Sequence, residues 1–291
     1  MTKVLIIGGT GMLGHKLVQV LSKDFNVWTS IRRSYASVKS CGIFDQEKTI
    51  EKVNVADFAS LDNLVETIKP NVVINAVGLI KQLPEATDAA RLTRINTELP
   101  HALEKLAGAF GFKLICISTD CVFSGDKGNY RESDVPDAID IYGRSKLLGE
   151  VTSENCLTIR TSIIGRELDT SHSLVEWFLR HRGKRVNGYT NAIYSGFPTI
   201  VFATIIARLI SDHPLINGLY HISSAPISKH SLLGLINRTY ETDIEILPVD
   251  DVVVDRSLDC SRFKSITCFE PQPWEAMIEQ MAADSTQYEA F

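Results

Sequence analysis

The chain has 291 residues, of which 44% are hydrophobic and 22% charged, with 10 prolines and 18 glycines. This ordinary globular composition excludes a disordered tail protein, a collagen-like fibre and a disulfide-rich miniprotein. Thirty basic residues against 35 acidic ones give a net charge of -5, which is unfavourable for binding the phosphate backbone of a nucleic acid. A local basic pocket for one phosphorylated small molecule is compatible with that charge.

Six scattered cysteines form no C-x-x-C pair and no Cys/His cluster with zinc spacing. We therefore expect no metal site and a reduced, cytoplasmic protein. The chain starts with an apolar strand and has no signal-peptide pattern. Its most apolar stretch, 200–210, is too short to span a membrane, so we expect no membrane partner. The oligomeric state is left open, a homodimer being one option.

Short apolar runs alternate with helical stretches along the first half of the chain. In chain order we expect a strand at 4–7, a helix at 12–21, strands at 26–31 and 52–55, a helix at 61–68, a strand at 72–77, a helix at 91–110, a strand at 113–118, a helix at 142–151 and a strand at 157–160. A helix at 199–210 and a strand at 219–223 return to the same sheet. Because strands separated by helices form right-handed βαβ units, this pattern predicts an α/β fold with a Rossmann-type, doubly wound parallel sheet.

The regular alternation fades after about residue 165, where glycine, proline and mixed loops become frequent. We therefore predict two domains in a discontinuous arrangement. Residues 1–165 and 199–224 would form the dinucleotide-binding domain, and residues 166–198 and 225–291 a smaller substrate-binding lobe.

A glycine-rich loop, GGTGMLG at 8–14, joins the first strand to the first helix. Gly8 permits a tight turn, Gly11 lets a pyrophosphate approach the backbone, and Gly14 lets helix and strand pack closely. The free N–H groups and the positive dipole end of the helix then face the ligand. The alternative is a purely structural glycine turn. The expected dinucleotide contacts are Gly8, Thr10, Gly11, Met12, Leu13 and Gly14.

The end of the second strand predicts which dinucleotide is bound. An acidic residue there favours NAD, and a basic one favours the 2′-phosphate of NADP. The chain has Arg32 and Arg33 and no acid at this point, and a guanidinium can bind phosphate through two hydrogen bonds. NADP(H) is therefore favoured over NAD(H), the alternative being two solvated loop arginines. Asp57 is a candidate either for the adenine amino group or for a helix cap.

Tyr142 and Lys146 lie four residues apart, hence on one face of a helix. A nearby ammonium stabilises phenolate and lowers the tyrosine pKa, which makes Tyr142 a candidate general acid for carbonyl reduction. Thr119, after the fifth strand, can hydrogen-bond the same carbonyl oxygen. A second Y-x-x-x-K pair, Tyr35 and Lys39, follows the second strand, where no nicotinamide would lie, and we interpret it as a solvated helix face.

These motifs together resemble the extended short-chain dehydrogenase/reductase family, and within it the dTDP-4-dehydrorhamnose reductases. The resemblance runs through GGTGMLG at 8–14, NAVG at 75–78, STDCVFSG at 118–125, IYGRSKLLGE at 141–150 and GLYHIS at 218–223. It implies that the substrate is a nucleotide-sugar and that NADPH reduces the 4-keto group of its 6-deoxyhexose, in the synthesis of deoxysugar or polysaccharide precursors.

The resemblance also implies roles for individual residues. Thr119, Tyr142 and Lys146 would be the catalytic group, and Lys146 would also hold the nicotinamide ribose. The cofactor would be lined by the glycine loop together with Asn75, Ala76, Val77 and Gly78.

Two alternative functions remain. One follows from residues that match a different enzyme type of the same superfamily, and the other from a non-catalytic protein that resembles the reductases. GDP-fucose synthases, which epimerise and reduce, have a cysteine two residues after the catalytic hydroxyl residue and a histidine in a Ser-His-apolar stretch. Cys121 and His172 match that pattern, so a bifunctional 3,5-epimerase/4-reductase is one alternative. The plainer interpretation is a buried cysteine and a histidine that begins a helix. The second alternative is a non-catalytic NADP-binding regulatory subunit, because a regulatory subunit of methionine adenosyltransferase resembles these reductases.

Overall fold

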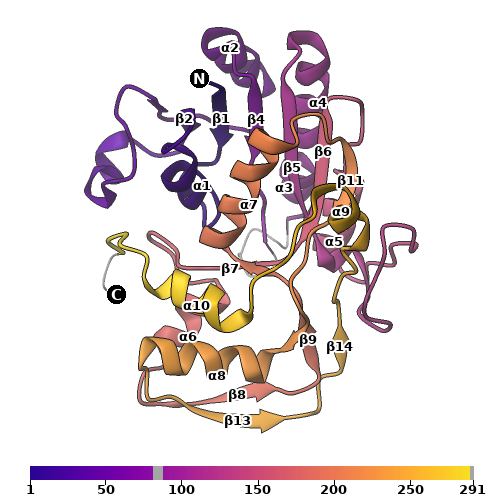
Figure 1. The fold of residues 1–291 in the computed structure, drawn as a ribbon. Helices are drawn as coiled ribbons and strands as arrows, with labels where there is room; N and C mark the ends of the chain where they lie inside the picture. Colours follow the sequence, from indigo (N-terminus) through magenta and orange to yellow (C-terminus); the bar gives the residue numbers. More distant parts are fainter. Residues whose placement is uncertain (81–87, 289–291) are drawn as a thin grey trace.

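A parallel sheet forms the centre of the computed structural model, which describes residues 1–80 and 88–288. Seven strands follow the order β11-β6-β5-β4-β1-β2-β3 within these ranges (Figure 1). They are β1 (Lys3–Ile7), β2 (Asn26–Ser30), β3 (Thr49–Ile50), β4 (Val72–Asn75), β5 (Lys113–Thr119), β6 (Cys156–Thr161) and β11 (Gly218–His221). The chain runs outward from β1 twice, once in each direction, which confirms the predicted doubly wound α/β fold.

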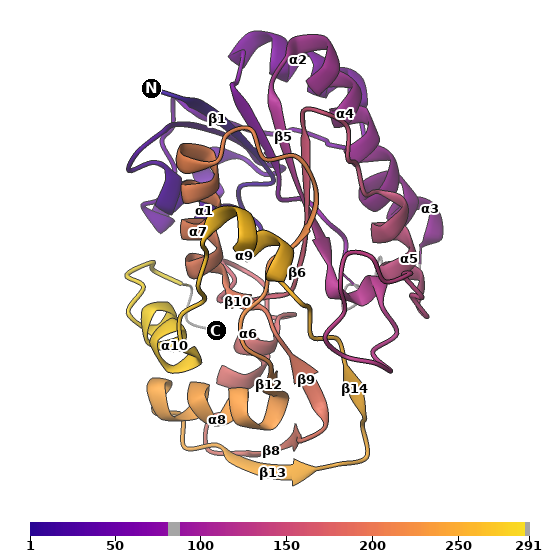
Figure 2. The same cartoon turned by 45° about the vertical axis from the view of Figure 1, so that its right-hand side comes forward.

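The sheet is buried on both faces, and β1 shows how its sequence causes this. Successive side chains of a strand point to opposite faces. Val4 and Ile6 belong to the hydrophobic cluster that contains α1 (Gly14–Leu21) and α7 (Thr199–Asp212). Leu5 and Ile7 belong to the opposite cluster, with α2 (Phe58–Ile68) and α4 (Leu99–Phe110). Figure 2 shows the sheet between these two helical layers. A continuous apolar run is therefore the pattern of a strand covered on both sides.

Several element boundaries differ from the sequence predictions. The third strand is β3, so the expected strand at 52–55 was wrong; Lys52 has a φ of 59°, a left-handed conformation that ends the strand. The first helix begins at Gly14, because the Gly11 N–H donates to the Gly8 carbonyl and closes a turn first. The helix expected at 91–110 is α3 (Ala89–Leu92), a π-helical segment η4 (Thr93–Glu98) and α4 in succession.

The interpretation of Tyr35 and Lys39 as one helix face was also wrong. Two separate short 3-10 turns, η1 (Tyr35–Ser37) and η2 (Lys39–Cys41), hold these residues. The Tyr35 hydroxyl donates to the Phe44 carbonyl at 3.3 Å, and its ring packs on the main core.

Most of the remaining elements lie beyond the carboxyl end of the sheet, in the lower part of both views, while α9 packs beside β11 at the edge of the sheet. β7 (Ile163–Ile164) pairs with β10 (Phe197–Pro198), and β8 (Arg185–Tyr189) pairs with β13 (Glu245–Val249). β12 (Ile227–Ser228), β9 (Ala192–Tyr194) and β14 (Val254–Asp255) form a third small sheet. The helices are α6 (Leu174–Leu179), α8 (Lys229–Tyr240), α9 (Ser261–Thr267) and α10 (Trp274–Ala282). The division into two domains at the predicted boundaries stays a prediction. In the described ranges, every helix is either too short or too polar to cross a membrane.

Candidate active site

The candidate site begins where β5 ends. Thr119 is buried, and the turn η5 (Asp120–Val122) follows it directly. The Cys121 N–H donates to Thr119 Oγ1 at 3.1 Å, and the Thr119 hydroxyl donates to Asp120 Oδ1 at 3.1 Å. Burial raises the pKa of Asp120, and the positive charge of Arg256 opposes that rise. This turn fixes the Thr119 hydroxyl at the carboxyl edge of the sheet, where open α/β sheets bind ligands.

The helix α5 (Ile141–Leu148) places Tyr142 beside this turn. Asp140 caps the helix by accepting a hydrogen bond from the Gly143 N–H at 2.7 Å. A Cβ at position 143 would overlap the Cys121 carbonyl oxygen, so only glycine lets the helix approach so closely. The approach brings Tyr142 within hydrogen-bonding reach of Thr119 and close to Cys121. Gly143 and Asp140 were missed by the sequence reasoning, although a glycine directly after a candidate catalytic tyrosine is a usable signal.

The pKa of Tyr142 is not lowered as the sequence predicted. Burial raises it, the charge of Cys121 raises it further, and the hydrogen bond with Thr119 opposes both. The Lys146 ammonium instead donates to the Ile117 carbonyl at 2.6 Å, and burial lowers the pKa of Lys146. Tyr142 is therefore a protonated phenol at neutral pH, which is the form that a general acid requires.

Lys146 also lies against the loop that follows β4. A Cβ placed on Gly78 would lie 3.7 Å from both Lys146 Nζ and Asn96 Oδ1. The Asn96 amide donates to the Leu79 carbonyl and to Ser145 Oγ, each at 3.0 Å, so it joins this loop to α5. Asn96 is 1% exposed and lies in the π-helical segment η4, a form that often marks functional positions. Sequence reasoning missed it; an asparagine on the buried side of a predicted helix was the available signal.

The glycine loop and the loop after β4 meet at the neighbouring ends of β1 and β4. Gly8 has a φ of 88°, and a Cβ there would overlap the Val77 side chain. A Cβ on Gly14 would overlap the Gly8 carbonyl oxygen, whereas Gly11 is exposed. The Ala76 N–H donates to the Ile7 carbonyl at 3.0 Å, and Asn75 Oδ1 accepts from the Val77 N–H at 3.1 Å. The glycine loop and residues 75–78, both predicted to bind the cofactor, therefore lie next to each other. The other predicted cofactor residues, Arg32, Arg33 and Asp57, are described below.

This arrangement fits a dinucleotide. The close packing of the loop depends on glycine at Gly8 and Gly14, where a Cβ would overlap neighbouring atoms, while a Cβ on Gly11 would lie 3.4 Å from the Gly8 carbonyl oxygen, in ordinary contact. Ser30, at the end of β2, has a buried hydroxyl without a hydrogen-bond partner among the described residues. Its backbone carbonyl accepts from the Gly9 N–H at 2.9 Å, so the hydroxyl lies next to the loop. An unsatisfied buried hydroxyl at that point is suited to a polar ligand.

Four predicted residues make none of the contacts described so far. Arg33 forms an ion pair with Asp169, their side chains being 46% and 27% exposed, while Arg32 is exposed to solvent. Asp57 occupies the N-cap position of α2, but its side chain accepts no capping hydrogen bond, so that alternative was wrong. His172 is exposed and precedes Ser173, which caps α6.

Residues 1–287 match the family model described as RmlD substrate binding domain. The chain belongs to this family. It is 25% identical over 303 residues to methionine adenosyltransferase 2 subunit beta from Bos taurus, with 96% of this chain and 86% of that protein covered. It also matches a crystal structure of a hypothetical dTDP-4-dehydrorhamnose reductase from Sulfolobus tokodaii, with a TM-score of 0.78, 28% identity, and coverage of 95% of this chain and 99% of that one.

A second solved structure, dTDP-4-dehydrorhamnose reductase from Bacillus anthracis in complex with NADP, has a TM-score of 0.79 at 22% identity. The match covers 97% of this chain and 98% of that one, and at this identity it concerns the fold. The family resemblance predicted from the motifs is confirmed by the family model and by these structures.

Two helical glycines test the close approach of α5. Replacing Gly143 with alanine forces α5 away from the Cys121 carbonyl, and we expect a loss of about 1–3 kcal/mol of unfolding free energy. Gly108, in α4, has open space around it, so Gly108→Ala serves as the control and stabilises the protein by up to about 1 kcal/mol. Urea unfolding measures both. Equal effects of the two substitutions would contradict the packing argument.

Proposed function

We propose that the protein is an NADPH-dependent reductase of the 4-keto group of a nucleotide-linked 6-deoxy-4-keto-hexose. The observation that carries this proposal is the convergence of Thr119, Tyr142 and Lys146 next to the glycine loop. Membership of the family and the names of the solved relatives support it. Tyr142 is a partly buried phenol beside the glycine loop, and carbonyl reduction requires one proton donor at that place.

Each residue then has a chemical task. NADPH, when bound, supplies the hydride for carbon C4 of the sugar. The Tyr142 hydroxyl delivers the proton to the C4 oxygen, so that the ketone becomes an alcohol. Thr119 orients the phenol through their hydrogen bond, and burial keeps the phenol protonated until the carbonyl oxygen gains charge. The Lys146 ammonium, held between the Ile117 carbonyl and the loop at Gly78, would bind the nicotinamide ribose.

Removing the phenol hydroxyl tests this assignment. We expect Tyr142→Phe to lower kcat/KM about 100- to 10,000-fold, because the proton donor is lost while the ring packing stays. Tyr35→Phe, in the other Y-x-x-x-K pair, is the matched control and keeps full activity. The assay follows cofactor absorbance with NADPH and NADH on a panel of 4-keto-6-deoxy nucleotide sugars. Undiminished turnover by Tyr142→Phe would refute the catalytic role.

The preference for NADP(H) is supported by Arg32 and Arg33. The ion pair with Asp169 places a carboxylate where Arg33 would meet the 2′-phosphate. That carboxylate competes for the guanidinium and repels the phosphate.

Neutralising the carboxylate tests the preference directly. We expect Asp169→Asn to tighten NADPH binding by about five-fold, roughly the strength of one partly exposed ion pair, and to leave NADH binding unchanged. Isothermal titration with both dinucleotides measures the two dissociation constants. An equal change for NADPH and NADH would show that Arg33 does not contact the 2′-phosphate.

A non-catalytic regulatory subunit is the second candidate, favoured by the similarity to methionine adenosyltransferase 2 subunit beta over 96% of this chain. The same assay separates the two functions. A wild-type protein that binds NADPH but oxidises it with no sugar of the panel would favour the regulatory role.

Cys121 lies close to Tyr142, and this position favours a test of the alternative in which the enzyme both epimerises and reduces the sugar. A thiolate there can remove a proton next to the C4 carbonyl, and an imidazolium such as that of His172 can return one from the other face. We expect such an enzyme to incorporate solvent deuterium at C3 or C5, and Cys121→Ser to abolish the incorporation while reduction continues. Mass spectrometry of the sugar measures this, and absence of deuterium from the wild-type product would rule epimerisation out.

A further inference from the structure

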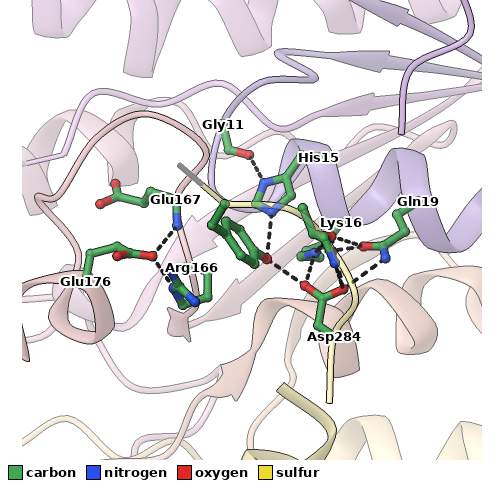
Figure 3. Close-up of polar contacts among 10 residues, drawn as sticks. Gly11, His15, Lys16, Gln19, Arg166, Glu167, Glu176 and Asp284 are labelled. Carbon is green, nitrogen blue, oxygen red and sulfur yellow. Dashed lines mark hydrogen bonds and ion pairs between the residues drawn. The ribbon is translucent and has the colours of Figure 1, made fainter. Parts of the chain in front are cut away.

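The segment 284–288, close to the C-terminus, packs on the helix that follows the glycine loop (Figure 3). Lys16 of α1 is 2% exposed, and its ammonium forms an ion pair with Asp284 and donates to Thr286 Oγ1 at 2.7 Å. The Gln19 amide donates to the other oxygen of Asp284 at 2.9 Å. A lysine is almost never this buried unless it is paired. Because Asp284 is the partner of Lys16, their ion pair holds the segment 284–288 against α1.

Tyr288 extends this contact to the glycine loop itself. Its hydroxyl donates to Asp284 Oδ2 at 2.6 Å and lies 3.4 Å from His15 Nε2. The other ring nitrogen, His15 Nδ1, lies 2.9 Å from the Gly11 carbonyl oxygen. Because a carbonyl can only accept, Nδ1 carries the proton and Nε2 has none. Since the Tyr288 proton goes to Asp284, Tyr288 contacts His15 edge-on through the rings, whose centres are 5.9 Å apart. His15 is fully buried, and burial lowers its pKa to about 4, so the ring is neutral at pH 7.

His15 fixes the direction of the peptide unit between Gly11 and Met12, because its backbone N–H donates to the Gly11 carbonyl at 3.1 Å and its ring Nδ1 lies 2.9 Å from the same oxygen. In a trans peptide the C=O and the following N–H point in opposite directions. With the Gly11 carbonyl turned toward His15, the Met12 N–H points away from it. Gly11 is exposed, so this peptide lies at the surface that an approaching pyrophosphate meets.

Tyr288 also contacts the segment that leads into α6. The Arg166 guanidinium lies 4.3 Å from the centre of the Tyr288 ring and forms an ion pair with Glu176. Glu176 Oε1 accepts from the Glu167 N–H at 3.1 Å. The ring therefore contacts both the glycine-loop helix and the start of the stretch that contains Asp169.

We propose that segment 284–288 sets the affinity for the dinucleotide, with Tyr288 and Asp284 acting as positioning residues through His15 and Lys16. The ligand class is a pyrophosphate-containing dinucleotide, so the proposal rests on the proposed cofactor binding. The glycine loop has little intrinsic rigidity, because glycine restricts its backbone less than any other residue. Fixing it before binding removes an ordering cost that would otherwise weaken the affinity.

Tyr288→Phe tests the proposal, because it removes only the hydroxyl whose hydrogen bond to Asp284 holds the Tyr288 ring against His15. The matched control is Tyr240→Phe, since the Tyr240 hydroxyl is buried and has no hydrogen-bond partner in the part of the chain that the structure describes. We expect Tyr288→Phe to raise the dissociation constant of NADPH about five-fold or more, in line with the loss of one buried hydrogen bond. Binding of dTDP, which probes the substrate nucleotide site, stays unchanged in both variants.

Amide hydrogen exchange of the ligand-free protein gives a second readout, independent of any cofactor. We expect faster exchange in the peptide that covers 8–14 in Tyr288→Phe and in Asp284→Asn, and no change in Tyr240→Phe. Unchanged exchange there, or equal loss of NADPH and dTDP affinity, would overturn the proposal. A wild-type protein that binds neither NADPH nor NADH would instead refute the proposed cofactor, while faster exchange in Tyr288→Phe would still support positioning of the loop by the tail.

Discussion

The site depends on how closely backbone segments can approach one another at the carboxyl edge of the sheet. Gly14 lets α1 start directly beside Gly8, and Gly143 lets α5 start directly beside Cys121. Both approaches place a helix start within a few atoms of a strand end, so backbone N–H groups and side chains of different elements converge without a long loop. Any side chain at either position would move a whole helix, and with it every group that the helix carries.

Desolvation determines the electrostatic character of the site. It raises the pKa of Tyr142 and of Asp120 and lowers that of Lys146, because burial disfavours the charged form of each group. A phenol that stays protonated holds the proton that a reduced carbonyl needs, while Lys146 keeps a carbonyl partner that compensates its burial. Sequence spacing shows that Tyr142 and Lys146 share a helix face, but the sign of the pKa shift depends on burial, which spacing does not reveal.

The fold could be predicted from the chain because buried parallel strands read as uninterrupted apolar runs, as in β1. The glycine loop and the Tyr142/Lys146 pair were found because their residues are close in sequence. Groups that meet through the fold were not found: Asn96 and Ser145 are 49 residues apart, and Lys16 and Asp284 are 268 apart. The position of β3 was missed because the residue types around Lys52 do not indicate that this lysine adopts a left-handed conformation.

A protein with a net negative charge can still bind anions if its positive side chains are distributed unevenly. The ion pairs show which of these side chains are already neutralised by a carboxylate. Lys16 and Arg166 lie near the glycine loop, but Asp284 and Glu176 neutralise them. Their contribution is therefore to packing and position rather than to attraction of a phosphate. For the proposed dinucleotide, the attraction at the loop would come from the N-terminal end of α1, and at the adenosine end from Arg32 together with Arg33, whose charge Asp169 partly offsets. In the proposed cofactor complex, selection between dinucleotides would depend on the partly exposed ion pair of Arg33 with Asp169, and binding of either dinucleotide on the buried pair of Lys16 with Asp284.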